Sequence, residues 1–449
     1  MAAETRDSIW TGGRRSAFGW ALYDWANSPF TTVVTTFIFA AYFVDAIAAD
    51  RTVGASQWAF VHGAAALIVA ILSPVLGAVA DRGRGRKAWI ILWTLLMVAA
   101  STALWWGAPG AGSTTLVLTA AFVGAVAFEM GIVFYNAMLP GLAPPSHIGR
   151  LSGWSWGLGY IGGLACLAML LFVFVRPESA PFGLDRAAAE HIRISGPVVA
   201  LWALVFSLPL FFLTADVPGA GLSIGRSVGA GMRELRATLV NVRRHRNIAR
   251  FLIARIFYID GLNTIFAVGA IYAAAVFGMS IEEVLVFGIL INITAGIGAF
   301  AFAWLDDRLG PKPVVLIGII GVVACGVPIL LIGDKTWFYI LGGIIGVFFG
   351  PAQAASRSLM GQLAPKGREA EMFGLYAFAG KSTAFLGPWL YGVVVLAAGH
   401  RWGMATVMPF LIAGALILLT VDGRPSDADE AQQGPNGSMS STRKMSQPN

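Results

Sequence analysis

Twelve long apolar runs follow one another along the chain, and each is long enough to cross a lipid bilayer, which takes about 20 residues. The runs lie at 17–44, 56–80, 88–107, 114–138, 151–175, 196–213, 251–277, 284–305, 313–333, 336–356, 372–398 and 403–421. Only 12% of the 449 residues are charged and 57% are hydrophobic, whereas a soluble domain carries about 25% charged residues. The chain is therefore predicted to be an all-α polytopic membrane protein with twelve transmembrane helices.

The runs fall into two groups of six, separated by a polar stretch that is rich in arginine. This spacing predicts an N-terminal segment at 1–16, a six-helix half at 17–213, a basic linker at 214–250, a second six-helix half at 251–421 and a disordered tail at 422–449. The tail is rich in Ser, Gln, Pro and Asn, a composition that is typical of disorder.

The positive charges predict the orientation of the helices. If the N-terminus is in the cytoplasm and the runs alternate in direction, 23 Lys and Arg residues fall on the cytoplasmic side and six on the other side. Cytoplasmic loops of membrane proteins carry such an excess, so both termini and the linker are expected in the cytoplasm. This asymmetry also explains the net charge of +7, and we do not expect nucleic-acid binding.

The two groups of six helices repeat each other. Three short motifs occur once in each group and in the same order: Asp-x-x-Asn-(Ser/Thr)-x-Phe at 24–30 and 260–266, Asp-Arg at 81–82 and 307–308, and Leu-Ala-Pro at 142–144 and 363–365. Two halves of the same orientation are typical of a parallel repeat about an axis along the membrane normal.

The loop at 77–87 reads Gly-Ala-Val-Ala-Asp-Arg-Gly-Arg-Gly-Arg-Lys and resembles the signature loop between helices two and three of the major facilitator superfamily, with one extra residue after Arg82. The second copy, at 307–312, has the usual spacing but carries Ala303 where glycine is expected. The segment Tyr-Asp-Trp-Ala-Asn-Ser-Pro-Phe at 23–30 resembles the branch that contains the autophagy-related vacuolar amino-acid effluxer of fungi and its bacterial relatives. The resemblance implies the major facilitator fold, with two pseudo-symmetric six-helix halves.

Five ionisable residues fall inside the apolar runs, where each costs a few kcal/mol unless it faces a cavity or a partner. They are Asp24, Glu129, Arg255, Asp260 and Lys381. In the superfamily, helices one, four, seven and ten line the central cavity, so the resemblance implies a substrate and coupling pathway along Asp24, Asn27, Glu129, Asp260 and Asn263. Lys381 joins this set as a candidate partner of Glu129. The alternative for each residue is a structural role, such as a helix-packing hydrogen bond, an ion pair of Asp24 with Arg255, or a Lys381 side chain that reaches the interface.

The end of the second run predicts a cytoplasmic gate. Asp81 is an acidic residue at a cytoplasmic helix end, where a carboxylate can face the positive N-terminus of a neighbouring helix. The basic residues beyond it can pair with acidic partners or with lipid headgroups. The candidate gate residues of the two copies are Gly77, Asp81, Arg82, Arg86, Asp307 and Arg308. The alternative for the arginines is a role as topology anchors alone.

These features predict a secondary active transporter that moves a small solute by alternating access. The resemblance favours amino acids as cargo and export as the direction, and carboxylates within the membrane allow coupling to protons. We expect a monomer in a bacterial inner membrane, in contact with lipids and its solute, without a cofactor or a metal site. An enzyme would need a nucleophile-base cluster or metal ligands near one face, and the sequence suggests neither. The alternative function is that of a lipid scramblase or a signalling protein on the transporter fold.

Overall fold

The computed structural model describes residues 10–83, 85–179, 181–217, 219–240 and 245–423. Arg84, Arg243, Arg244 and most of the predicted N-terminal segment and tail lie outside these residues. Within the described residues the regular structure is entirely helical. Twelve helical spans are long and apolar enough to cross a membrane, which confirms the predicted fold class.

The N-terminal half holds the first six spans. Its helices are α1 (Gly13–Pro29), α2 (Phe39–Tyr42), α3 (Arg51–Arg82), α4 (Lys87–Ala103), α5 (Thr114–Leu142), α6 (Ile148–Leu170), α7 (Glu190–Arg193) and α8 (Ser195–Leu213). Segments of π-helix lie at Phe30–Phe37, Phe43–Ile47 and Leu171–Val175, and short 3-10 turns at Leu104–Trp106, Ala111–Ser113 and Pro181–Gly183.

The linker contains one helix, α9 (Ile224–Val240), and the C-terminal half holds the remaining six spans. The helices of that half are α10 (Arg246–Phe277), α11 (Ile281–Leu309), α12 (Pro311–Leu331), α13 (Lys335–Leu363), α14 (Glu369–Lys381), α15 (Leu386–Ala398), α16 (His400–Ala405) and α17 (Val407–Leu419). The eleventh span, Glu369–Ala398, is interrupted by a turn at 382–385 between α14 and α15.

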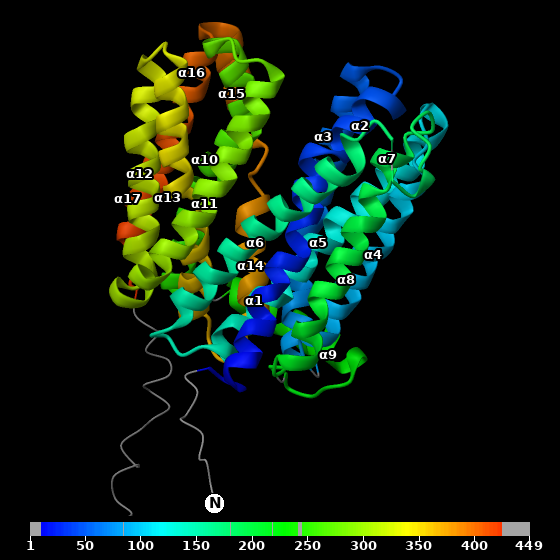
Figure 1. The fold of residues 1–449 in the computed structure, drawn as a ribbon. Coiled ribbons are helices and arrows are strands. Elements are labelled where there is room, and N and C mark those ends of the chain that lie inside the picture. Colours follow the sequence, from blue (N-terminus) through cyan, green and yellow to red (C-terminus); the bar gives the residue numbers. More distant parts are fainter. Residues whose placement is uncertain (1–9, 84, 180, 218, 241–244, 424–449) are drawn as a thin grey trace, which may run out of the picture.

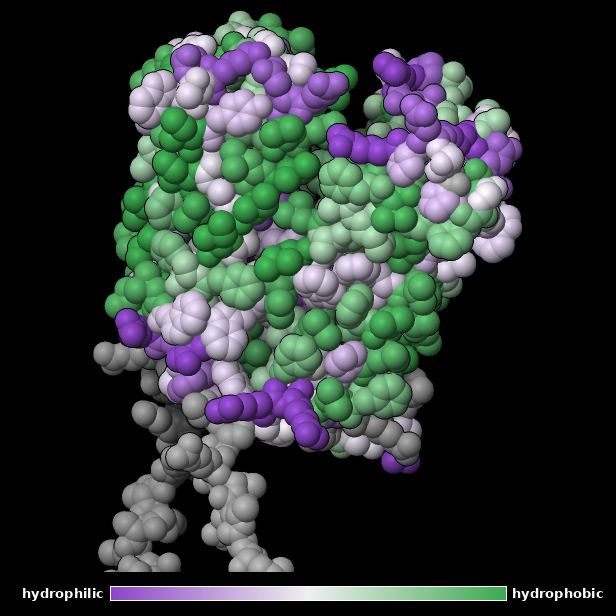
Figure 2. Space-filling view, viewed as in Figure 1, coloured by the Kyte–Doolittle hydropathy of each residue, from purple (hydrophilic) through white to green (hydrophobic). Residues whose placement is uncertain are grey.

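The two halves form helical bundles that meet mainly along two pairs of helices, α3 with α14 and α6 with α11, with further contacts of α5 with α14 and of α6 with α13 (Figure 1). Figure 1 shows α9 at the end of the molecule where α1 begins, and we call this the α9 end. At the opposite end, which we call the open end, the surface is hollowed between the bundles (Figure 2). The bundles therefore diverge away from α9.

Glycines allow the halves to approach each other at both pairs. A Cβ atom on Gly374 of α14 would lie 2.3 Å from the carbonyl oxygen of Ser73 in α3. A Cβ atom on Gly153 of α6 would lie 2.6 Å from the carbonyl oxygen of Ala299 in α11. Small residues permit such close backbone contact between membrane helices, and these glycines occupy matching positions in the repeat.

Pro29 is the residue at which the first span changes from α-helix to π-helix. Proline has no backbone N–H, so the carbonyl of Trp25, four residues earlier, has no helical donor. The indole Nε1 of Trp202 in α8 donates to this carbonyl at 3.1 Å. Directly after Pro29 the chain continues as the π-helix Phe30–Phe37, a type of irregularity that is frequent at functional sites.

Two predicted boundaries differ from the structure. The helix α10 begins at Arg246, so Arg246 and Arg250 belong to its first turns rather than to the linker. The helix α13 continues to Leu363, so Arg357 lies inside a span and not in a cytoplasmic loop. An arginine lowers the local hydropathy and ended the apolar run at 356, although the helix continues.

Candidate functional site

A cavity of about 330 Å³ lies between the halves. Polar and aromatic side chains line it: Asp24, Asn27, Ser28, Thr31, Thr32, Phe128, Glu129, Asn136, Trp156, Tyr160, Arg255, Asn263, Asn292, Gln353, Arg357, Phe373, Tyr376 and Lys381. A second, more apolar cavity of about 430 Å³ shares Thr31, Thr32 and Asn292 with it and extends to Val284 and Phe338 near the open end. The second cavity therefore adjoins the first and lies between it and the open end.

Five of the six predicted pathway residues line the first cavity, namely Asp24, Asn27, Glu129, Asn263 and Lys381. Helices α6, α11 and α14 also contribute lining residues, so the cavity is not built by the first, fourth, seventh and tenth spans alone. Asp260 differs from the expectation, because it is 1% exposed and does not line the cavity. Its carboxylate lies near the backbone of Gly387 at the start of α15.

Glu129 and Lys381 form an ion pair across the cavity between the two halves. Lys381 Nζ donates to Glu129 Oε1 at 2.5 Å, and each side chain is 28% exposed. Lys381 is the last residue of α14, where the partial negative charge of the helix end favours a cation. The candidate partners proposed from sequence therefore contact each other.

Asp24 pairs with Arg357, which was missed from the sequence. Arg357 Nη1 lies 3.0 Å from Asp24 Oδ2 and donates to Asn136 Oδ1 at 3.2 Å. Its Nη2 donates to the carbonyl of Ser152 at 2.6 Å. The guanidinium faces the rings of Trp20, Tyr135 and Trp156. The signal that would have found Arg357 is the repeat, since the offset that aligns the Leu-Ala-Pro motifs also aligns Arg357 with Asn136.

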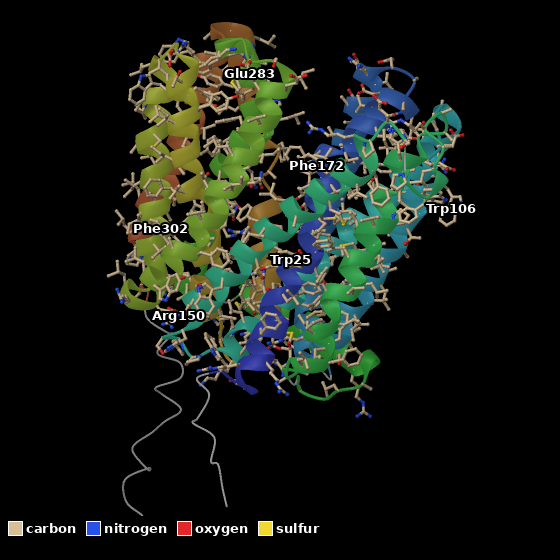
Figure 3. The ribbon with its side chains drawn as sticks, in the orientation of Figure 1. Trp25, Trp106, Arg150, Phe172, Glu283 and Phe302 are labelled. Carbon is tan, nitrogen blue, oxygen red and sulfur yellow. The ribbon has the colours of Figure 1, made fainter. Side chains whose placement is uncertain are left out.

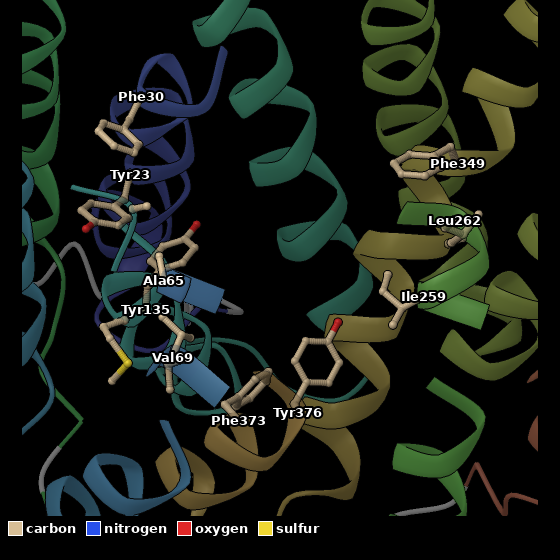
Figure 4. Close-up of a cluster of buried hydrophobic side chains, with 14 of the residues drawn as sticks. Tyr23, Phe30, Ala65, Val69, Tyr135, Ile259, Leu262, Phe349, Phe373 and Tyr376 are labelled. Atoms are coloured by element: carbon tan, nitrogen blue, oxygen red, sulfur yellow. The ribbon is translucent and has the colours of Figure 1, made fainter. Parts of the chain in front are cut away.

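Arg255, the alternative partner of Asp24, instead lies against Tyr376 of α14. Its guanidinium carbon is 3.5 Å from the centre of the Tyr376 ring, and Nε donates to the Tyr376 carbonyl at 3.3 Å. Figure 4 shows Phe373 and Tyr376 between the N-terminal residues Tyr23 and Tyr135 and the C-terminal residues Ile259, Leu262 and Phe349. The helix α14 therefore carries aromatic side chains into the space between the halves.

At the α9 end, Asp81 is the centre of a buried polar cluster. Its two carboxylate oxygens accept from the backbone N–H groups of Ala370 at 3.0 Å and Glu371 at 2.8 Å, at the N-terminus of α14. Arg86, which is 2% exposed, donates to Asp81 at 2.9 Å and to Glu369 at 2.6 Å. We call Asp81, Arg86, Glu369 and these two N–H groups the Asp81 cluster. It joins α3 to α14 and hence one half to the other.

The linker helix α9 adds a second connection beside this cluster. Glu234 of α9 pairs with Arg82 at the end of α3 and, at 3.0 Å, with Arg368 just before α14. Thr238, one turn later, donates to Glu371 at 2.5 Å. The linker helix thus bonds to both halves at once.

At the matching position of the repeat, Asp307 joins α11 to α6. Its carboxylate accepts from the backbone N–H of Arg150 at 3.0 Å and from the side-chain Nε of Arg150 at 2.8 Å. The neighbouring Asp306 is buried and its Oδ1 has no hydrogen-bond partner among the described residues. Arg308 is exposed. Figure 3 shows Arg150 near the α9 end and Glu283 at the opposite end of the molecule.

The residues that the structure describes contain no group of three or more His, Cys, Asp and Glu side chains placed to hold a metal ion. Cys166 and Cys325 are both buried and free.

The sequence also matches a known protein family. Residues 43–431 match the family described as "Vacuole effluxer Atg22 like". The chain belongs to this family. An uncharacterized MFS-type transporter of Bacillus subtilis, YxiO, is 26% identical over 425 residues, which cover 92% of this chain and 96% of that relative. Autophagy-related protein 22 of Cryptococcus neoformans is 28% identical over 290 residues, which cover 60% of this chain and 49% of the fungal protein.

Solved structures show the same fold. The human organic anion transporter MFSD10 has a TM-score of 0.71 and 13% identity, and the match covers 90% of this chain and 99% of that chain. The transporter FucP in its outward conformation has a TM-score of 0.71 and 16% identity, covering 91% and 98%. The protein is therefore a major facilitator superfamily transporter of the Atg22-like branch, a class of carriers and not of enzymes.

Proposed function

We propose that this protein is a secondary active transporter that moves a small polar solute by alternating access. The observation that carries the proposal is a polar, charge-lined cavity between two six-helix halves that continues toward one end and is closed off by the Asp81 cluster at the other. Transporters of this architecture bind solute near the interface of the repeats and rock the halves about it.

The α9 end is proposed to face the cytoplasm, with both termini on that side, because the described arginines of the linker and of the loop after α3 lie there and cytoplasmic loops are rich in Lys and Arg. In this assignment Gly77, Asp81, Arg82 and Arg86, with Asp307 and Arg308 in the second copy, belong to a cytoplasmic gate. Opening toward the cytoplasm would separate α3 from α14 and break the Asp81 cluster. The state described here is then the outward-facing one.

Amino acids are proposed as the first cargo to test, with export from a bacterial cell across the plasma membrane as the direction. The support is membership of a family described as vacuole effluxers and the match to YxiO of Bacillus subtilis. We further propose that the carrier functions as a monomer among membrane lipids, because each copy contains a complete cavity between its own two halves.

Glu129 is proposed as the proton-coupling carboxylate. It is half-buried in the cavity and paired with Lys381 at 2.5 Å, so protonation of Glu129 would release Lys381 and change the charge of the cavity. Substitution Glu129→Gln keeps the shape but removes titration. It should abolish transport driven by a pH gradient while exchange of cargo down its own gradient continues.

A purely structural ion pair predicts a different result. Glu129→Gln would then destabilise the protein by leaving Lys381 unpaired, and adding Lys381→Met would restore stability. Unchanged pH-driven transport in Glu129→Gln would reject the coupling role.

The function is tested by reconstituting the full-length protein in proteoliposomes and screening radiolabelled solutes with and without a pH gradient. Accumulation of a solute above its equilibrium level only when the gradient is present supports a proton-coupled carrier. Lipid exchange between leaflets without uptake of any solute would instead identify a scramblase. Single-cysteine labelling of α9 from outside intact cells would overturn the proposed orientation.

A further inference from the structure

The unpaired polar atoms that line the cavity share one property. Asn27 Nδ2, Trp156 Nε1 and Arg255 Nη1 are buried and have no hydrogen-bond partner within the described part of the chain. All three are N–H donors, and none of the unpaired buried acceptors of the described residues belongs to a side chain that lines this cavity. A buried donor without an acceptor costs about 1–3 kcal/mol. The cavity therefore lacks acceptors that a bound solute would supply.

Arg255 is the cation of the cavity that has no carboxylate partner. The two acidic lining residues are already paired, Asp24 with Arg357 at 3.0 Å and Glu129 with Lys381 at 2.5 Å. Among the described residues Arg255 forms no ion pair, and its contacts include the ring and the carbonyl of Tyr376 and the side chain of Tyr258. Three cations and two carboxylates thus line the cavity, which leaves one positive charge uncompensated.

The position of Arg255 is fixed by α14. Arg255 is 7% exposed and its guanidinium lies on the Tyr376 ring, a contact that holds the planar group and is stabilising when water is excluded. A Cβ atom at Gly380 would lie 3.1 Å from Arg255 Nη2, so the glycine leaves the room that the guanidinium occupies. Asp260 does not serve as a partner, because residues five apart on a helix do not share a face.

We propose that Arg255 binds an anionic group of the transported solute, a carboxylate, with the N–H groups of Asn27 and Trp156 as further donors. This inference rests on the proposed transport function and specifies its substrate class. The planar guanidinium fork matches a carboxylate in a bidentate manner. A cavity of about 330 Å³ is at the small end of ligand sites, so the solute is a small organic acid, with or without an ammonium group.

The test measures thermal unfolding of the purified full-length protein with matched pairs of compounds that differ in one group. The pairs are propionate with propionamide, L-leucine with L-leucinamide and succinate with succinamide, and methyl phosphate is a further probe. Wild-type protein is expected to be stabilised by at least one carboxylate and not by its amide. Arg255→Gln should abolish this shift, and Arg255→Lys should weaken the apparent affinity by about tenfold or more, because Lys lacks the fork.

Arg250→Gln is the matched control. Arg250 lies on the same helix, outside the cavity, and donates Nη1 to the carbonyl of Thr420, so its substitution should leave the carboxylate shift unchanged. Gly380→Ala is a second test that retains the charge, because its methyl group would contact Arg255 Nη2 at 3.1 Å and the resulting shift of the guanidinium should weaken carboxylate binding. Both variants and Arg255→Gln are first compared with wild type by size-exclusion profile and by unfolding temperature without ligand.

Equal stabilisation by acid and amide, no stabilisation by any of the carboxylates, or an unchanged shift in Arg255→Gln would overturn the inference. Stabilisation by methyl phosphate alone would show that the site binds a phosphate group and not a carboxylate. Proteoliposome uptake distinguishes failure of the anion site from failure of the transport proposal. If the carboxylate shift is absent or persists in Arg255→Gln while wild-type protein still carries a solute, the transporter function stands and the anion site is rejected.

Discussion

At the α3–α14 junction the Asp81 carboxylate accepts from two backbone N–H groups and pairs with buried Arg86, whereas at the α6–α11 junction Asp307 accepts from one backbone N–H and pairs with Arg150. The Arg150 side chain is 29% exposed and that of Arg86 is 2% exposed. Arg86 also binds Glu369, whereas the matching position of the second copy is Pro311, which has no side-chain donor.

The repeat in the sequence thus preserves the position of the contact between the halves but not its hydrogen bonds or its burial. Removing one partner of a buried, hydrogen-bonded ion pair costs more free energy than removing one partner of a partly exposed pair. We therefore expect the α3–α14 junction to set the energy of the closed α9 end and the α6–α11 junction to contribute less. Four substitutions test this expectation, from the largest effect to the smallest.

Asp81→Asn should lower the transport rate by about tenfold or more with near-normal abundance in the membrane. Removing one partner of a buried ion pair costs about 3–5 kcal/mol, and this cost falls on the state in which α3 and α14 are joined. Uptake in proteoliposomes and quantitative immunoblots of the membrane fraction provide the two measurements. Abundance that falls in step with activity would identify Asp81 as a folding residue instead.

Gly77→Ala should reduce transport by about fivefold or more, since overpacking costs about 1–3 kcal/mol. A Cβ atom at this position would lie 2.2 Å from the Ala370 carbonyl oxygen, so α3 and α14 would have to move apart. The matched control is Ala303→Gly at the equivalent position of α11, for which we expect a change of less than about twofold. Equal effects at the two positions would contradict the unequal roles of the junctions.

Asp307→Asn should lower the transport rate by only about threefold, because part-exposed Arg150 can turn to water when its partner is neutralised. The measurement is the same uptake assay, run in parallel with Asp81→Asn. A loss as large as that of Asp81→Asn would show that the two junctions carry equal weight.

Glu234→Gln should change the rate by about twofold or less, since ion pairs that reach solvent contribute about 0.2–1 kcal/mol and the Arg82 and Arg368 side chains are 37% and 20% exposed. It removes the connection of α9 to Arg82 and Arg368. Raising the salt concentration should reduce the difference between this variant and wild type, because screening weakens the same contacts. A tenfold loss would instead show that α9, and not the Asp81 cluster, contributes most of the stability of the α3–α14 junction.

The fold could be predicted from the sequence because the fold depends on local hydropathy and on motifs that repeat between the two halves. Each apolar run is long enough to be recognised alone, and the Asp81 loop and the Asp24 segment are short contiguous motifs. The candidate site was predicted only in part. Arg357 stands at the edge of an apolar run and was counted as a loop residue, although α13 continues to Leu363. Asp260 occupies the position of Asp24 in the second copy of the motif but does not line the cavity. The motif specifies the residue and not the helices that pack against it.

The sequence alone was therefore enough to predict the twelve helices, their division into two halves of the same orientation and most of the charged residues inside the membrane, although not Arg357. These properties follow from hydropathy and spacing along one chain. Only the tertiary structure decided which charges pair. Asp24 and Arg357 are separated by 333 residues and Glu129 and Lys381 by 252, and these pairings depend on how α1 and α5 pack against α13 and α14. Only when those pairs are known can Arg255 be recognised as the cavity cation that has no carboxylate partner.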